Sequence, residues 1–350
     1  MTLAALSQQR RSLGCSGIRV SLLGFGAAPI GNLYRPVPAE EAHRAVRSAL
    51  DLGFKYFDTA PYYGFGLSES RLGFELARGG AEDVVLSTKV GRLLRPLAPS
   101  GEAPKSVRHG FADTPDLEPL FDYSYDGVMR SFEESLGRLQ CPQLGLLYAH
   151  DLGAVVHRSE HRRQWKIFSE GGYRALCELK RAGLVGAIGL GTNEWQVCEQ
   201  ALDELELDVF LLAGRYTLLE QGACHSFLPR CARAGVSVVL GGPFNSGILA
   251  TGVGERHSGP HYYNYEPASA TIVERVAALE AVCEAFVVPL AAAALQFPAA
   301  HPQIASVVAG LASEAQVQQA KTWMDWPIPE AFWQCLRERN LVDELAPLPS

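Results

Sequence analysis

The sequence predicts an α/β protein folded as a closed (β/α)8 barrel. Eight short apolar runs alternate along the chain with amphipathic helical patterns. A helical pattern followed by a glycine and then by a strand recurs along the chain. No linker rich in proline, glycine or serine divides the 350 residues. With 47% hydrophobic side chains, the chain can bury a large core. Eight βα units favour a barrel over a doubly wound sheet.

The apolar runs are the expected strands. Short runs of this kind are typical of parallel strands that are covered on both faces. They lie at 22–26, 55–59, 84–90, 144–150, 185–190, 208–213, 236–241 and 304–310.

Helices are expected between these strands because apolar residues recur with helical spacing. The pattern i, i+3, i+4, i+7 occurs within 42–49, and similar patterns occur at 129–139 and 173–177. Glycine takes the left-handed conformation that often ends a helix without steric cost. Such glycines follow three of the expected helices, at Gly53, Gly183 and Gly235.

Two long insertions interrupt the alternation, at about 91–125 and 242–269, and each follows the end of an expected strand. In a barrel, active sites are built at the carboxyl ends of the strands. We therefore expect these insertions to form lids or substrate walls. The second contains the aromatic run HYYNY, residues 261–265.

Composition excludes several classes of function. A formal net charge of −7 gives no basic surface for nucleic acid or an anionic membrane. The longest apolar stretch, 286–298, is too short for a membrane span and contains two prolines. The N-terminus lacks the charge order of a secretory signal, and the eight cysteines have no CxxC spacing. We expect a cytoplasmic protein with reduced thiols.

Side chains capable of acid–base chemistry stand at the ends of three successive expected strands. Asp58 ends the second strand and is followed by Tyr63. Lys89 ends the third strand and His150 the fourth. Because the carboxyl ends of parallel barrel strands meet at one rim, we expect the four side chains to converge.

This group can move a proton on or off a substrate oxygen. An ammonium such as that of Lys89, held charged by Asp58, would lower the pKa of the Tyr63 phenol. His150 could donate a hydrogen bond to the same substrate oxygen. None of these groups moves a hydride, so a nicotinamide cofactor must supply that part.

Each of these residues also has a purely structural interpretation. Asp58 alone could be a helix cap or a turn residue, and Tyr63 alone a half-buried aromatic. Lys89 alone could be a solvated charge and His150 a hydrogen-bonded core histidine. The four together, at successive strand ends, favour the catalytic interpretation.

The sequence resembles the aldo-keto reductase superfamily. LGFG, FDTAPYYGFGLSESRLG, LSTKVG, the strand ending in His150, and GLGTN occur in that family's order across about residues 11–325. The resemblance implies one barrel domain over 1–350, with a helical tail at 326–350 and an N-terminal β-hairpin cap formed by 10–24. It also implies that Asp58, Tyr63, Lys89 and His150 are the catalytic tetrad, with Tyr63 as the acid and base.

The resemblance further implies a nicotinamide dinucleotide bound without a Rossmann domain. Asn193 occupies the position that binds the carboxamide, and the stacking aromatic of the family is replaced by the turn at 241–247, unless Phe244 or Tyr216 serves instead. The expected cofactor-binding residues are Gly26, Asp58, Thr192, Asn193, Gly241, Gly242, Pro243, Phe244, Asn245, Gly247, Gly310 and Gln316.

The resemblance also bears on whether NAD or NADP is the preferred dinucleotide. Relatives that prefer NADP carry a lysine and an arginine where this chain has Gly310 and Gln316. Without a cation, a 2′-phosphate loses its charge-assisted hydrogen bonds. We therefore expect NAD to be preferred, with NADP as the alternative if Lys321 or a loop arginine substitutes.

The runs at 23–34, 214–221 and 241–249 are similar to those of L-fucose and D-threo-aldose 1-dehydrogenases, pyridoxal dehydrogenase and L-galactose dehydrogenase. This similarity implies oxidation of an aldose at C1 to a lactone; pyridoxal oxidation, aldehyde or ketone reduction, and a nicotinamide-sensing regulatory subunit are the alternatives. Tyr34 and Trp195 could line the substrate beside Tyr63 and His150, although each could equally be a packing residue. We expect a monomer or homodimer, no metal, and no nucleic-acid or membrane partner.

Overall fold

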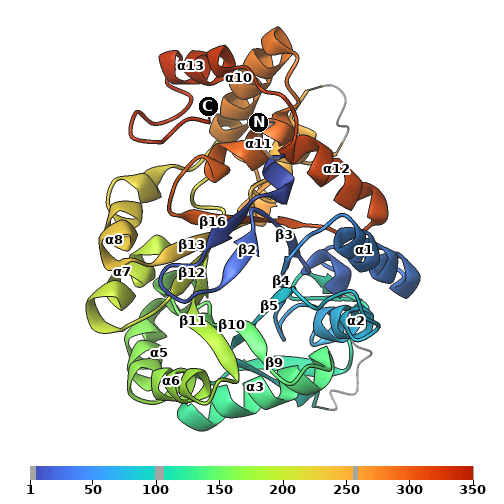
Figure 1. Cartoon of the computed structure of the whole chain (residues 1–350), viewed down its shortest axis with the longest axis vertical. Coiled ribbons are helices and arrows are strands. Elements are labelled where there is room, and N and C mark those ends of the chain that lie inside the picture. Colours follow the sequence, from blue (N-terminus) through green and yellow to red (C-terminus); the bar gives the residue numbers. More distant parts are fainter. Residues whose placement is uncertain (1–4, 99–105, 255–258, 350) are drawn as a thin grey trace.

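The computed structural model describes residues 5–98, 106–254 and 259–349. Eight parallel strands form a closed barrel, in which each strand pairs with the next along the chain and the last pairs with the first (Figure 1). All eight predicted strands are confirmed. They are β3 (Leu23–Gly26), β4 (Tyr56–Asp58), β5 (Val85–Val90), β10 (Leu144–His150), β11 (Val185–Thr192), β12 (Val209–Ala213), β13 (Ser237–Gly241) and β16 (Ile304–Gly310).

Helices surround the barrel as the periodicity predicts. The helices that follow the strands are α1 (Ala39–Asp51), α2 (Leu67–Leu76), α3 (Tyr125–Leu139), α5 (His161–Ile167), α6 (Tyr173–Arg181), α7 (Trp195–Glu204), α8 (Phe227–Ala234), α11 (Leu290–Ala299) and α12 (Glu314–Met324). Further helices are α4 (Ala154–His157), α9 (Ile248–Thr251), α10 (Ala270–Phe286) and α13 (Glu330–Glu338), the last within the expected C-terminal tail. Gly53, Gly183 and Gly235 have φ angles of 86°, 74° and 68°, so the predicted left-handed helix ends are confirmed.

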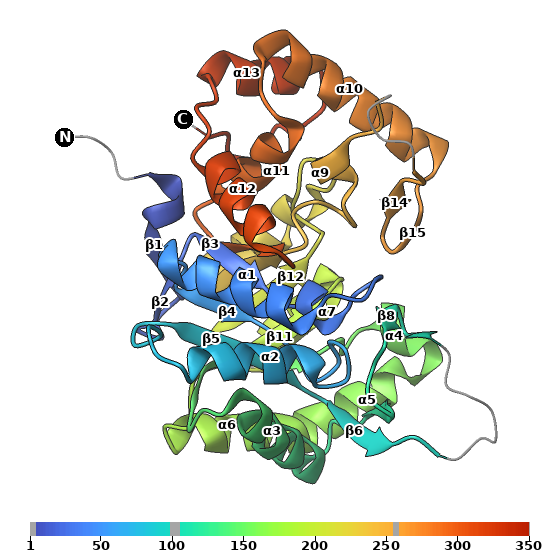
Figure 2. The ribbon, with the colours of Figure 1, turned by 90° about the vertical axis from the view of Figure 1, so that its right-hand side faces the viewer.

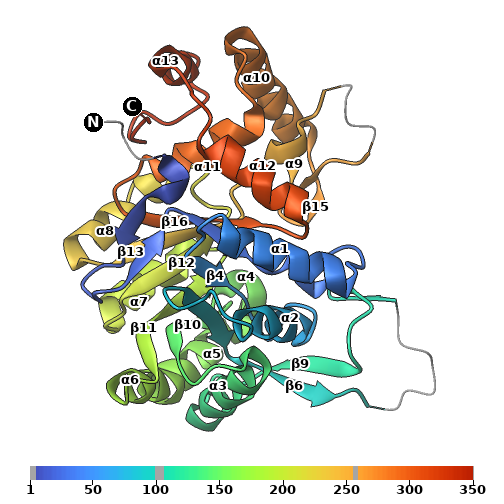
Figure 3. The same cartoon turned by 45° about the vertical axis from the view of Figure 1, so that its right-hand side comes forward.

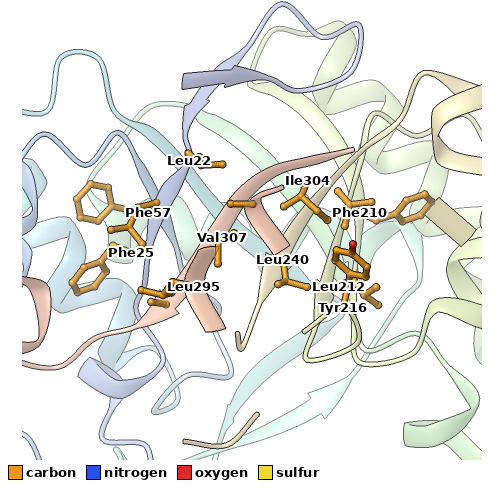
Figure 4. Packing of buried hydrophobic residues seen from close by; sticks show 14 of the residues in the cluster. Leu22, Phe25, Phe57, Phe210, Leu212, Tyr216, Leu240, Leu295, Ile304 and Val307 are labelled. Carbon is orange, nitrogen blue, oxygen red and sulfur yellow. The ribbon is translucent and has the colours of Figure 1, made fainter. Parts of the chain in front are cut away.

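The core has two parts because successive strand residues point to opposite sides of the barrel wall. One set packs outward against the helices; Figure 4 shows Phe57 and Leu240 of this set together with Leu295 of α11. The other set fills the barrel interior and includes Tyr56 and Tyr148. A fully packed interior leaves only the ends of the barrel for a binding site.

An N-terminal hairpin closes one end of the barrel, as expected. β1 (Arg10–Ser12) pairs antiparallel with β2 (Arg19–Ser21). Leu13 and Val20 pack into the interior cluster, and Arg11 donates a hydrogen bond to the Ile304 carbonyl at 2.7 Å. Figure 2 shows the hairpin at one end of the barrel and the insertion strands at the other.

The two insertions form short hairpins at the carboxyl ends of the strands. In the first, β6 (Arg92–Pro96) pairs with β9 (Leu117–Phe121), and β7 (Val107–Arg108) with β8 (Phe111–Ala112). Figure 3 shows β6 and β9 projecting from the barrel beside α2 and α3. In the second, β14 (Tyr262–Tyr263) pairs with β15 (Glu266–Pro267). The parts of the predicted lids at 99–105 and 255–258 lie outside the described residues.

Two compositional features can be compared with the structure. All eight cysteines are free thiols, and Cys198, Cys224, Cys231 and Cys283 are buried. Within the described residues, no single helix is long and apolar enough to cross a membrane; only the sharply bent pair α10 and α11 reaches that length and composition together.

Candidate active site

Strand alternation places three of the four predicted catalytic side chains at one end of the barrel interior. Asp58 ends β4 and His150 ends β10, and the β5 residue Lys89 lies in register with Tyr148 of β10. All three catalytic side chains are buried, with Lys89 1% exposed. The structure therefore brings together the residues that the strand ends predicted.

Lys89 and Asp58 form a buried ion pair. The Lys89 ammonium donates to Asp58 Oδ2 at 2.7 Å and to the Thr59 carbonyl at 2.8 Å. The other carboxylate oxygen accepts from the Ser87 hydroxyl at 2.7 Å. A buried pair of charges is tolerated only when further hydrogen bonds satisfy both groups, and these bonds do so.

A hydroxyl network below this pair fixes its position. The Tyr56 hydroxyl lies 2.9 Å from Ser87 Oγ and 3.1 Å from the Tyr148 hydroxyl, and all three residues are buried. Each stands two positions before a catalytic residue on its strand, so it points to the same interior face. Buried networks of this kind are rigid when every member is bonded.

Tyr63 lies in a tight turn directly after β4. Its N–H donates to the Ala60 carbonyl at 3.1 Å. Gly64 has a φ of 63°, and a Cβ there would lie 2.2 Å from the Gly31 carbonyl oxygen, so only glycine fits. This close approach to the loop after β3 explains the glycine of FDTAPYYG. It fixes Tyr63 with its ring 4.7 Å from the Lys89 ammonium.

The expected lowering of the Tyr63 pKa is not found. Burial raises the pKa of Tyr63 well above its usual value, and the Asp58 charge acts in the same direction. The Lys89 charge does not offset this, because the ammonium is already neutralised by Asp58 at 2.7 Å. Tyr63 therefore holds its proton at neutral pH.

His150 is neutral at ordinary pH. Burial lowers its pKa to about 3, and Lys89 and Arg92 act in the same direction while Asp151 opposes them. Its ring stands at 87° to that of Tyr63, with centroids 5.9 Å apart. Its Nδ1 is buried and has no hydrogen-bond partner in the described chain. A neutral imidazole keeps one N–H, so His150 can donate one hydrogen bond to a ligand.

A cavity of about 490 Å³, which we call the catalytic cavity, opens above these residues. Tyr63, Lys89 and His150 lie at its base, and both insertions contribute to its walls, as predicted. Several of its lining residues were not singled out from the sequence. They are Leu33, Tyr62, Arg92, Phe111 and Asp151.

A second cavity of about 680 Å³, the long cavity, adjoins the first. Asp58, Tyr63 and Tyr34 line it, and it continues past the turn at 241–247 to α12. Tyr34 and Tyr63 line both cavities. The long cavity has the size of a cofactor site, and it begins where a nicotinamide would have to meet Tyr63.

The turn at 241–247 suits the pyrophosphate of a dinucleotide. Among the described residues, the N–H groups of Phe244 and Ser246 donate to no backbone carbonyl. A Cβ at Gly247 would meet nothing within 4 Å, so the turn faces open space there. Backbone N–H groups around such a space bind anions. The long cavity therefore fits the predicted cofactor.

Asn245 has a structural part in this turn. It accepts a hydrogen bond from the Thr217 hydroxyl at 2.6 Å and donates to the Gly214 carbonyl at 3.1 Å. Its φ angle of 44° lies in the left-handed region, where asparagine is better tolerated than most residues. Asn245 lines the long cavity while its side chain shapes the turn.

The far end of the long cavity carries no cation among the described residues. Gly310 and Gln316 line it, as expected, and no described lysine or arginine does. Gln316 Oε1 accepts from the Ala312 N–H at 2.7 Å, so this side chain also caps α12. Lys321, considered above as a substitute cation, instead pairs with Asp325 at 3.0 Å.

The remaining predicted residues divide into two groups. Thr192 and Asn193 line the catalytic cavity. Trp195 lines neither cavity and packs against the core at the start of α7, so the structure does not bring it to the substrate region. Tyr216 is fully buried with its ring against Phe297, so it cannot replace the stacking aromatic. Phe244 lines the long cavity and remains the candidate.

Comparisons with known proteins agree with this architecture. Residues 22–340 match the Aldo/keto reductase family. The chain is 43% identical over 344 residues to a pyridoxal 4-dehydrogenase of Microbacterium luteolum, covering 96% of this chain and 98% of that protein. It is 35% identical over 337 residues to a D-threo-aldose 1-dehydrogenase of a Pseudomonas species, covering 96% and 99%.

A solved structure is also similar. The holo form of an aldo-keto reductase from Bacillus halodurans matches with a TM-score of 0.70 at 25% identity, covering 97% of this chain and 96% of that one. The fold, the family match and these relatives agree in confirming the resemblance read from FDTAPYYG and the strand ends. The chain belongs to the aldo/keto reductase family and is an NAD(P)-dependent oxidoreductase.

Proposed function

We propose that this protein oxidises the hydroxyl of a cyclic hemiacetal to a lactone, with NAD as the cofactor. Pyridoxal and aldoses both close to cyclic hemiacetals, so the two kinds of relative named above share this chemistry. The observation that carries the proposal is the placement of Tyr63, Lys89 and His150 at the base of one cavity that adjoins a dinucleotide-sized cavity.

The four catalytic residues divide the proton chemistry. In its phenolate form, Tyr63 takes the proton from the hemiacetal hydroxyl. His150, being neutral, donates a hydrogen bond that fixes the same oxygen. The Lys89 ammonium, paired with Asp58, packs over the Tyr63 ring at 4.7 Å from its centre and so holds the ring in place. A bound nicotinamide would supply the acceptor for the hydride that leaves the carbon bearing this oxygen.

Residues along the two cavities would hold the cofactor. Asn193 and Thr192, which line the catalytic cavity, would bind the nicotinamide carboxamide, and Phe244 of the long cavity would contact the ring. The N–H groups of the 241–247 turn would bind the pyrophosphate. Gly26, Gly310 and Gln316 lie along the remaining wall of the long cavity.

The preference for NAD rests on charge. The 2′-phosphate of NADP carries nearly two negative charges and requires a cation for tight binding. Among the described residues, no lysine or arginine lines the long cavity. An uncharged ribose, as in NAD, needs no such partner.

The walls of the catalytic cavity favour a flat ring over a sugar. Tyr34, Tyr62, Phe111 and Tyr265 contribute aromatic faces or edges to it. A flat aromatic ring stacks on such walls, whereas every hydroxyl of a sugar needs a polar partner to replace water. We therefore place pyridoxal first and rank aldose oxidation, the first expectation from sequence, second.

A spectrophotometric screen tests the proposal. Purified protein is mixed with NAD or NADP and with pyridoxal, L-fucose, D-arabinose, L-galactose or simple alcohols, and reduced nicotinamide is measured. We expect rapid NADH formation with pyridoxal and weaker formation with an aldose. No oxidation of any hemiacetal, together with cofactor retained through purification, would contradict the proposal and favour a nicotinamide-sensing subunit.

A further inference from the structure

Asp151 follows His150 directly, yet both residues line the catalytic cavity. Successive residues of a strand normally point to opposite faces. Asp151 escapes this alternation because its φ angle is 54°, in the left-handed region, while its N–H donates to the Gly191 carbonyl at 2.8 Å. A strained backbone that turns a carboxylate toward the reacting groups points to a functional use.

Arg92 holds this carboxylate in one position. Its guanidinium lies 2.5 Å from Asp151 Oδ2. It is also stacked between two rings, 3.9 Å from the centre of Tyr62 and 4.3 Å from that of Phe121. The side chains of Arg92 and Asp151 are only 11% and 16% exposed. A bidentate or stacked arginine loses little further freedom, so the carboxylate is preorganised.

The second carboxylate oxygen is available to a ligand. Within the described chain, Oδ2 of Asp151 accepts from Arg92, and Oδ1 accepts no hydrogen bond. His150 Nε2 lies 3.6 Å from Oδ2, too far for a hydrogen bond. Asp151 therefore does not orient His150 by direct bonding. The two residues stand side by side as separate polar groups facing the same cavity.

We propose that Asp151, held by Arg92, determines substrate specificity by accepting a hydrogen bond from a second hydroxyl of the substrate, next to the hydroxyl that is oxidised. This inference rests on the proposed function, because it specifies which hemiacetals that site accepts. Aldoses carry such a hydroxyl at C2. In its uncharged tautomer, pyridoxal carries one on the ring carbon next to the carbon that bears the hemiacetal.

The test compares matched substrates that differ only in this hydroxyl. The pairs are L-fucose with 2-deoxy-L-fucose, and pyridoxal with its analogue lacking the ring hydroxyl. We expect the unaltered protein to favour the hydroxylated member by at least about tenfold in kcat/KM, because its loss leaves a buried acceptor unpaired. Asp151→Ala should remove most of this preference, because kcat/KM falls much further for the hydroxylated member of each pair than for the deoxy member.

Two further variants complete the experiment. Asp151→Asn keeps the shape and one acceptor oxygen, so we expect an intermediate preference, and it substitutes for the alanine variant if that variant does not fold. Asp116→Ala removes an exposed carboxylate of the first insertion that lies outside the cavity, and it should keep the full preference.

Different results would overturn different claims. An equal loss on both members of a pair in Asp151→Ala, or no preference in the unaltered protein, would overturn the role of Asp151 while leaving hemiacetal oxidation intact. No oxidation of either member by the unaltered protein would overturn the proposed function, and the inference with it.

Discussion

The Lys89 ammonium donates to the Asp58 carboxylate at 2.7 Å, and both side chains are almost completely buried. Neither charge could remain there alone, because desolvation of an unpaired charge costs several kcal/mol. The pair therefore acts as one unit, which holds a cation below the ring of Tyr63 without a large loss of stability.

Removing one member of this pair should destabilise the protein more than removing both. For Lys89→Met we expect the free energy of unfolding to fall by about 3–5 kcal/mol, because Asp58 is left as an uncompensated buried charge. The double variant Lys89→Met with Asp58→Asn should recover at least half of that loss. Chemical denaturation of the single and double variants measures both values.

In these Lys89 and Asp58 variants, turnover should not recover when the free energy of unfolding does. The double variant lacks the cation beside Tyr63, so we expect its turnover to stay below about 1% of the unaltered level. Recovered turnover in the stable double variant would show that the ion pair is structural only.

Tyr63→Phe should abolish acid–base catalysis without disturbing the cofactor. We expect kcat to fall by at least about a hundredfold, while the dissociation constant for NAD changes less than about threefold. Tyr125→Phe serves as the matched control. It removes a hydroxyl on the outer helix α3 that donates a hydrogen bond to Glu178 of α6. Near-normal turnover in Tyr63→Phe would assign the proton transfer to another group.

The rate of oxidation should rise toward alkaline pH. Burial raises the pKa of Tyr63, so the phenolate that acts as base becomes more populated as the pH increases. Burial lowers the pKa of His150 to about 3, so this residue stays neutral above about pH 5 and contributes no change near pH 6.5. A profile of kcat/KM that peaks at neutral pH and falls toward pH 9 would contradict these assignments.

A cation at the far end of the long cavity should improve the use of NADP. Gln316→Arg places a guanidinium where the cavity has none, and we expect the NADP to NAD ratio of kcat/KM to rise by at least about tenfold. Gly310→Lys is less suitable, because a Cβ there would lie 3.1 Å from Pro29 Cγ. Gln318→Arg, on the same helix but outside the long cavity, is the control. Equal ratios in both variants would mean that the adenosine end lies elsewhere.

The sequence predicted the barrel and the catalytic residues for one physical reason. Strand ends in a parallel barrel meet at one rim, so residues such as Lys89 and His150 could be placed together from their positions alone. The same rule extended by one or two residues would have indicated Asp151 and Arg92, which follow the ends of β10 and β5. They were missed because the left-handed backbone of Asp151 is not visible in the residue pattern.

Side-chain environments were harder to predict than positions. The pKa of Tyr63 depends first on its burial and then on the charge of Asp58, and residue spacing reveals neither. Trp195 follows a strand end like the catalytic residues, yet its indole packs into the core. Whether the side chain of a loop residue points into the cavity depends on the backbone angles of the loop, and the spacing of residues in the sequence does not reveal these angles.

The most direct test of the proposed function follows the atoms of one turnover. Pyridoxal carrying deuterium at the hemiacetal carbon is incubated with NAD, and the earliest products are examined by mass spectrometry. The proposal predicts deuterated NADH and a lactone as the first product, since the hemiacetal ring stays closed during the oxidation. A free carboxylic acid as the first product, or no deuterium transfer to NAD, would contradict hemiacetal oxidation.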